Sequence, residues 1–260
     1  MKTDAIDFRR NATFKAVDTF SHLRLSDVTS LAEVLACLDD LQQTDPAQRF
    51  LCTLDDLGQC CYSSMHACED ALLQPDDDVD VDFDDPVSLH AHEARRLGHV
   101  LAQLDNPAHR QDWRALAEAR QSAQADVEAL VAMNRDPDRV LAHDDVVYVQ
   151  RVPAARNDLL IAGLPNGYFS ADWNVFQNHA LLRHMEAAHG YRFFGIGASW
   201  LGFVRPQAPN ADAARRLVDD LALIYRSDDA AAATAAWSDL AALLTARRTL
   251  LLGYTENFAD

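Results

Sequence analysis

The clearest structural pattern of the chain lies in residues 163–206, which read GLPNGYFSADWNVFQNHALLRHMEAAHGYRFFGIGASWLGFVRP. Pro165-Asn166-Gly167 has the composition of a turn, because proline presets φ and Asn-Gly tolerates a positive φ. Asp172 or Ser170 is placed to cap a helix that begins after it. Gly190 stands where a left-handed glycine ends such a helix. We therefore predict a turn followed by one helix that stops at this glycine.

Two short apolar runs follow the helix, at residues 191–196 and 200–204, and each is interrupted by glycine. Such runs are typical of buried strands. Gly195-Ile196-Gly197 has the look of a dinucleotide-binding loop, but that loop requires a helix directly after its glycines. An apolar run follows here instead. We therefore expect these glycines to allow close packing or a bend in a sheet.

Hydrophobic periodicity predicts further elements on both sides of this stretch. Helices are expected over 28–38, 87–104, 107–131, 210–225 and 228–244, and strands over 50–54, 59–62, 146–152, 158–162 and 249–254. Asp55-Asp56-Leu57-Gly58 has the composition of a hairpin turn between the first two strands. These elements indicate an α+β fold, with an acidic, mostly helical first part and a small mixed β-sheet domain packed with helices.

The order of turn, helix, glycine stop and strand pair resembles the bacterial family known as domain of unknown function 4253. The resemblance rests on His189-Gly190-Tyr191, on the strand pair from Gly195 to Phe203, and on a proline-led helix from Pro209. It covers roughly residues 150–260. Many members have a Cys-Pro-Asp step after the last helix, where this chain has Arg226-Ser227-Asp228. The family brings no established chemistry. Its members occur among polymorphic-toxin and immunity genes, which implies a role in protein interaction.

Charge is distributed unevenly along the chain. The net charge is −17, and residues 1–150 hold 13 basic and 29 acidic residues, whereas residues 151–260 hold 10 and 11. We therefore predict an acidic, mostly helical region over 1–138 and an α+β domain over 139–260. Nucleic acid and anionic membranes are poor matches for the acidic region, because phosphate contacts require Lys and Arg. A basic protein is favoured as partner, although solubility alone also accounts for an acidic surface.

The acidity peaks between Pro75 and Pro86. Seven aspartates gather there: Asp76, Asp77, Asp78, Asp80, Asp82, Asp84 and Asp85. Mutual repulsion keeps such a segment solvated until a partner binds it. We interpret the segment as a solvated acidic loop or as a partner-binding segment, and these seven aspartates are the candidate partner-binding residues. A calcium site is the third interpretation, but the segment lacks the glycine and the closing glutamate of the usual calcium loop.

Polar and aromatic residues also gather at the start of the central helix. The candidates for a cleft there are Tyr168, Asp172, Trp173, Asn178 and His179. A helix N-terminus with such groups can bind an anion or a loop of a partner. The structural alternative is a helix cap beside core aromatic side chains.

The histidines give no metal site by their spacing. His179, His184 and His189 follow one another at intervals of five, so they point in three directions on a helix. His92 and His99 stand two helical turns apart, about 10 Å, which is too far for one ion. We therefore predict neither a metal nor a cofactor.

Five cysteines occur early in the chain: Cys37, Cys52, Cys60, Cys61 and Cys68. An odd number without a secretion signal argues for reduced thiols. No apolar run approaches the ~20 residues needed to cross a bilayer, and the first residues lack the apolar region of a signal peptide. We expect a cytoplasmic protein.

The sequence contains no nucleophile elbow, Walker loop or zinc-protease motif. Together with the charge and the family resemblance, this favours a non-enzymatic binding protein. Our hypothesis is an immunity protein of interbacterial competition, which neutralises a basic toxin through its acidic surface. Two alternatives stay open: a small-molecule enzyme or ligand-binding domain that uses Asp172, Asn178 and His179, and a structural or oligomeric scaffold. The oligomeric state stays open as well.

Overall fold

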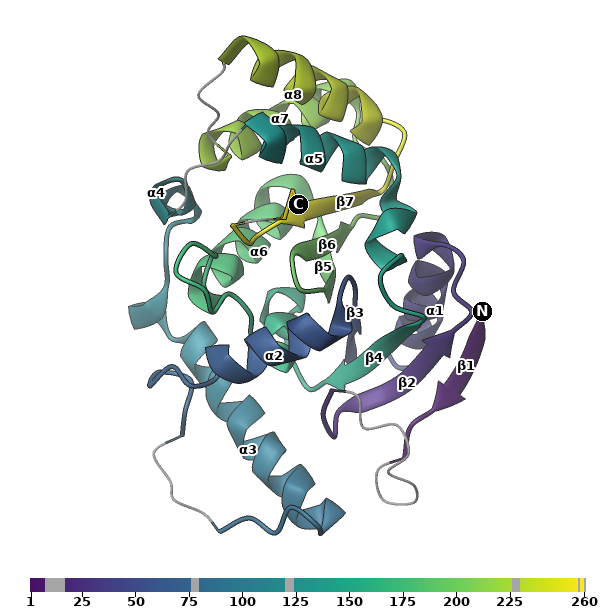
Figure 1. The fold of residues 1–260 in the computed structure, drawn as a ribbon, viewed down its shortest axis with the longest axis vertical. Helices are drawn as coiled ribbons and strands as arrows, with labels where there is room; N and C mark the ends of the chain where they lie inside the picture. Colours follow the sequence, from purple (N-terminus) through teal and green to yellow (C-terminus); the bar gives the residue numbers. More distant parts are fainter. Residues whose placement is uncertain (8–16, 76–79, 120–123, 226–229, 257, 260) are drawn as a thin grey trace.

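Seven strands of the described chain form one mixed sheet (Figure 1). The structure is a computed structural model and describes residues 1–7, 17–75, 80–119, 124–225, 230–256 and 258–259. The strands are β1 (Lys2–Ala5), β2 (Ser21–Ser26), β3 (Arg49–Thr53), β4 (Val146–Val152), β5 (Arg192–Ile196), β6 (Trp200–Val204) and β7 (Thr249–Gly253). They lie in the order β1-β2-β4-β3-β5-β6-β7. Only the pair β3–β5 is parallel among these neighbours.

Helices pack around this sheet. The α-helices are α1 (Leu31–Thr44), α2 (Leu57–Ala67), α3 (Pro86–Asp105), α4 (Leu116–Ala119), α5 (Gln124–Arg135), α6 (Val175–His189), α7 (Ala211–Ile224) and α8 (Ala230–Leu244). Short 3-10 helices are η2 (Pro107–His109), η3 (Trp113–Ala115), η4 (Pro137–Leu141) and η5 (Asn157–Gly163). α8 packs against α5 and α7 at the upper end of Figure 1, while α3 extends to the lower end. The α+β class predicted from the sequence is confirmed.

The central stretch folds as its local signals predict, with one change at the helix start. α6 is capped by Asn174, which forms a capping box with Gln177, and not by Asp172 or Ser170. Gly190 ends the helix with φ +70°, and the two glycine-interrupted runs are β5 and β6. Gly197 lies so close to the backbone of Asp55 that a Cβ would overlap it. The expected close packing at this glycine is therefore confirmed.

The predicted hairpin at residues 50–62 is wrong, because its second half is helical. Residues 59–62 lie in α2, whose first turn is capped by the side chain of Asp56. Asp55 turns away and accepts hydrogen bonds from the backbone N–H groups of Ser199 and Trp200. The short strand predicted at 158–162 is likewise part of η5, and the long helix predicted at 107–131 is broken into several short helices.

The predicted regions 1–138 and 139–260 share one sheet. β1, β2 and β3 precede residue 139, so the first region contributes three strands to the sheet beside its helices. β3 lies between β4 and β5, which both come from the second region. Leu25 and Leu51 of the first region and Phe203 of the second belong to one hydrophobic core. Residues on both sides of the predicted boundary near 138 therefore build the same sheet and the same core.

Within the described chain, the helices are too short or too polar to cross a membrane.

Candidate functional site

The acidic segment before α3 is exposed where the structure describes it. Asp80, Asp82, Asp84 and Asp85 all lie at the surface. Asp82 accepts a hydrogen bond from the N–H of Asp84, and Asp85 caps α3 by accepting from the N–H groups of Val87 and Ser88. The other predicted partner-binding residues, Asp76, Asp77 and Asp78, lie outside the described residues. Two of the four described aspartates thus also shape the chain that carries them.

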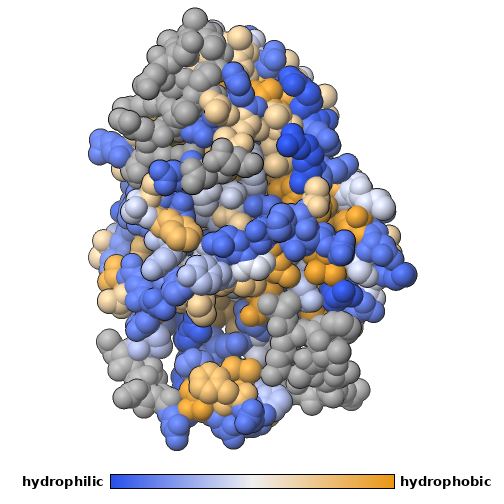
Figure 2. Space-filling model, viewed as in Figure 1, coloured by the Kyte–Doolittle hydropathy of each residue, from blue (hydrophilic) through white to orange (hydrophobic). Residues whose placement is uncertain are grey.

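Two large apolar side chains stand among these carboxylates. Phe83 is 67% exposed and Val87 is 65% exposed. The ring of Phe83 lies edge-on to that of His92, with centroids 6.2 Å apart. Figure 2, in the view of Figure 1, shows apolar patches between hydrophilic residues at the lower end of the molecule, to which α3 extends. We name Asp80, Asp82, Phe83, Asp84 and Val87 the acidic–apolar segment. Its pattern is an apolar centre with a charged rim, as in many protein interfaces.

A second exposed patch lies on α2 and on the turn before α6. Rings follow one another from Tyr62 to His66, Tyr168 and Phe169, with centroid distances of 4.5, 4.9 and 5.3 Å. Tyr62 is 49% exposed, Tyr168 46% and Phe169 47%, and Met65 beside them is 55% exposed. We call these five residues the aromatic patch. Tyrosine and other aromatic side chains are enriched in the energetically important centres of interfaces.

Carboxylates lie at both ends of α2. At its start, Asp56 accepts from the N–H of Gln59 and Asp144 accepts from the N–H of Leu57. At its end, Glu69 Oε1 lies 3.2 Å from His66 Nδ1. Acidic groups near a helix start are favoured by the helix dipole. The aromatic patch is therefore flanked by acidic side chains.

The five residues predicted to form a cleft serve different purposes. Tyr168 belongs to the aromatic patch. Trp173 and Asn178 have no exposed surface, and both are held by backbone oxygens: Trp173 Nε1 donates to Leu116, and Asn178 Nδ2 donates to Trp173. Asp172 accepts from the N–H of Glu256 near the end of the described chain. These contacts place Trp173 and Asn178 in the core and Asp172 at a chain crossing, while the helix cap expected there is Asn174.

His179 and Asp158 form a buried pair that the half-exposed Arg156 links to Asp105 at the surface. Its Nε2 lies 2.8 Å from Asp158 Oδ2, and Arg156 donates to the same carboxylate and to Asp105. Burial opposes the ionisation of Asp158, but the hydrogen bonds from His179 and Arg156 outweigh it and lower the pKa of Asp158 to about 2. The network joins η5 to α6. The sequence did not indicate this contact, because Asp158 was predicted to lie in a strand at 158–162 and not in a 3-10 helix beside α6.

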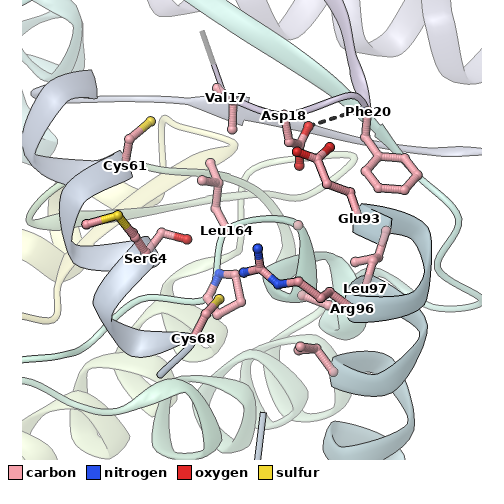
Figure 3. Close-up of a pocket in the computed structure, with 15 residues that line it drawn as sticks. Val17, Asp18, Phe20, Cys61, Ser64, Cys68, Glu93, Arg96, Leu97 and Leu164 are labelled. Atoms are coloured by element: carbon pink, nitrogen blue, oxygen red, sulfur yellow. Dashed lines mark hydrogen bonds between the residues drawn. The ribbon is translucent and has the colours of Figure 1, made fainter. Parts of the chain in front are cut away.

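A cavity of about 350 Å³ lies between α2, α3 and the segment that follows η5 (Figure 3). Asp18 and Glu93 stand on one side of it, and Arg96 reaches in from α3 toward Cys68. Burial raises the pKa of Asp18 to about 7, although Gln150 donates a hydrogen bond to its carboxylate. None of the lining residues was predicted as a site, because they come from distant parts of the sequence.

The thiols in this cavity are poor nucleophiles. Burial raises the pKa of Cys61 to about 11, and it also raises the pKa of Cys68, although Arg96 opposes the second shift. A thiol reacts as its thiolate, so both groups stay in the unreactive form near neutral pH. The cavity therefore offers charge and hydrogen bonding to a small polar molecule, and its cysteines do not equip it for nucleophilic chemistry.

Comparison with family models, curated proteins and solved structures found no match to this chain. The resemblance to domain of unknown function 4253 therefore stays a prediction.

Proposed function

We propose that the chain is a binding protein whose partner is a protein with a basic surface. The observation that carries the proposal is the acidic–apolar segment, in which Phe83 and Val87 are each about two-thirds exposed among aspartates. An exposed phenylalanine is unfavourable in water, and burying it against a partner removes that cost. The aspartates around it would select a positively charged surface.

The aromatic patch supports the same function. It offers Tyr62, Tyr168 and Phe169 as anchors and is flanked by the carboxylates at the ends of α2. Both surfaces come mainly from the first 138 residues, which hold most of the acidic excess of the chain. We further propose binding rather than turnover as the activity, because three of the five predicted cleft residues serve packing and chain crossing.

A more specific version is an immunity protein that neutralises a bacterial toxin in the cytoplasm. Its support is the family resemblance, the acidic surface and the absence of a disulfide among the five cysteines, all of which the structure describes. Reduced thiols fit a reducing compartment. The toxin would carry the basic surface, and binding would cover it.

The test is affinity capture with variants that remove charge and leave the fold intact. Asp80, Asp82 and Asp84 are changed to Asn together, while Asp85 stays because it caps α3. The matched control changes Asp212, Asp219 and Asp239 to Asn, which removes equal charge from the exposed surface of α7 and α8. A second variant, Phe83→Ser with Val87→Ser, removes the apolar centre.

We expect the wild type and the control to retain one basic protein that neither test variant retains. High salt should release it, because screening weakens exposed charge pairs first. The toxin version further requires that the captured protein stop growth when expressed alone and that the wild type restore growth. Equal capture by the wild type and both test variants would contradict the proposal.

A further inference from the structure

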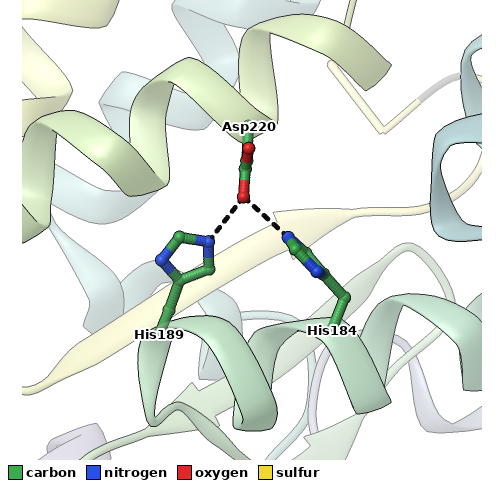
Figure 4. Close-up of side chains that lie close together, drawn as sticks. All are labelled: His184, His189 and Asp220. Atoms are coloured by element: carbon green, nitrogen blue, oxygen red, sulfur yellow. Dashed lines mark hydrogen bonds and ion pairs between the residues drawn. The ribbon is translucent and has the colours of Figure 1, made fainter.

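Two histidines and one aspartate meet between α6 and α7 (Figure 4). His184 Nε2 lies 2.7 Å from Asp220 Oδ2, and His189 Nε2 lies 2.9 Å from the same oxygen. One donor atom from each of the three residues lies within 4.8 Å of the others. Within the part of the chain that the structure describes, this is the one group of three or more such side chains close enough to share a metal ion.

The convergence is not visible in the sequence spacing. Residues five apart on a helix point about 140° away from one another, which is why no metal site was predicted. His189 is the last residue of α6, directly before the left-handed Gly190. The two imidazole rings lie with centroids 5.3 Å apart, and Asp220 reaches both of them from α7. The site therefore needs two helices, and α6 alone would not make it.

The rings are held in place before any ion arrives. His184 stacks on Trp113 of η3, with ring centroids 3.8 Å apart and planes 12° apart. The side chains of His184, His189 and Asp220 are only 16%, 7% and 28% exposed. A ligand set that is already ordered loses little conformational freedom on binding.

We propose that His184, His189 and Asp220 form a binding site for a divalent transition metal ion of the Zn²⁺ type. Imidazole nitrogens with one carboxylate oxygen are a donor set that Zn²⁺ accepts. A tetrahedral Zn²⁺ with bonds of about 2.0–2.1 Å holds its donor atoms about 3.3 Å apart. The present separations of 2.7 and 2.9 Å require the side chains to open by about half an ångström. Three protein ligands leave one position for water or for a group from another molecule.

The plain alternative is a hydrogen-bonded link between α6 and α7 without any ion. In that case both histidines donate to Asp220, and the group adds to stability only. A metal site and a purely hydrogen-bonded link predict different effects of replacing the Asp220 carboxylate with an amide. Asn at position 220 still accepts a hydrogen bond, but it is a weak metal ligand because it carries no charge.

The experiment is a titration of the untagged full chain with Zn²⁺ by calorimetry, with thermal unfolding as a second readout. We expect one bound equivalent and a rise in Tm of about 5 °C or more at a hundredfold excess over the Kd. Asp220→Asn and His189→Gln should each weaken binding by about tenfold or more. The control is His143→Gln, which removes an exposed histidine that also lies beside two carboxylates, Asp56 and Asp144.

Co²⁺ serves as a spectroscopic probe of the ligands, because thiolate ligands give a charge-transfer band that nitrogen and oxygen ligands do not. We expect visible bands without that charge transfer. Folding of each variant is checked by its circular dichroism and its Tm without metal. The proposal is overturned if the wild type binds no ion, if Asp220→Asn binds as tightly as the wild type, if His143→Gln abolishes binding, or if cobalt reports a cysteine ligand.

Discussion

Asp18 is a carboxyl group whose ionisation the fold opposes. Burial raises its pKa from 3.8 to about 7, and the neighbouring Glu93 adds repulsion. The folded chain therefore keeps a proton on Asp18 at pH values where the unfolded chain has lost it. Because the folded state then binds more protons, the stability linked to this group falls as the pH rises from about 4 to about 7.

We predict that Asp18→Asn removes this pH dependence. One pKa unit corresponds to about 1.4 kcal/mol, so between about pH 5 and pH 7 the wild type should lose up to about 3 kcal/mol more of its unfolding free energy than the variant. Urea denaturation at several pH values measures this difference. Asp212→Asn, at an exposed position at the start of α7, is the control and should follow the wild type. Parallel curves for the wild type and Asp18→Asn would show that Asp18 is ionised in the fold.

The polar residues at the start of α6 have roles that the sequence pattern alone does not determine. The polar residues there correctly mark a helix start, because caps are local. Which of them caps and which is buried depends on distant partners. Asp172 accepts a hydrogen bond from the N–H of Glu256, and Trp173 donates one to the carbonyl of Leu116. Asn174 is therefore the residue that caps the helix. A pattern of residue types carries no information about those partners.

At the scale of elements, Asp85 joins the acidic segment to α3 and caps the start of that helix. Asp85 accepts from Val87 N at 3.2 Å and from Ser88 N at 3.1 Å. We predict that Asp85→Ala lowers the unfolding free energy by about 1 kcal/mol, whereas Asp85→Asn changes it by only a few tenths, because Asn caps as well as Asp. Urea denaturation of both variants tests this. Equal losses would mean that the charge of Asp85, and not its cap, stabilises the helix.

Elements with complete local signals were predictable, and those that depend on a neighbour were not. α6, β5 and β6 carry their own caps, glycines and apolar runs, and all three form where expected. Residues 59–62 of α2 were mistaken for a strand because the start of this helix depends on Asp55, which accepts from the N–H groups of Ser199 and Trp200, 144 and 145 positions away. Once Asp55 is fixed there, Asp56 is free to cap a helix.

At the scale of the whole molecule, the sheet interleaves the two halves of the sequence. β3 pairs with β4 on one side and with β5 on the other. We predict that a fragment of residues 139–260 does not fold alone, because removing β3 leaves two strand edges and their apolar faces exposed. Thermal unfolding followed by circular dichroism should give a cooperative transition for the full chain and none for the fragment. A sharp transition for the fragment would mean that it is an independent domain.

The acidic charge of the molecule is concentrated in its first part. The lopsided distribution was visible in the sequence, but the exposed apolar residues within it were not, because exposure depends on the fold. Phe83 and Val87 turn an acidic segment into a surface with an apolar centre. The candidate metal ligands lie on α6 and α7 and not in this segment, so metal binding and partner binding can be tested independently.

The most direct test of the binding proposal is the Kd of the captured basic partner for three chains at low salt. These are the wild type, the triple Asn variant at Asp80, Asp82 and Asp84, and the triple Asn control on α7 and α8. We predict that the first variant binds about tenfold more weakly, a loss of about 1.4 kcal/mol, and that the control matches the wild type. Equal affinity of all three chains would show that the acidic–apolar segment is not the binding surface.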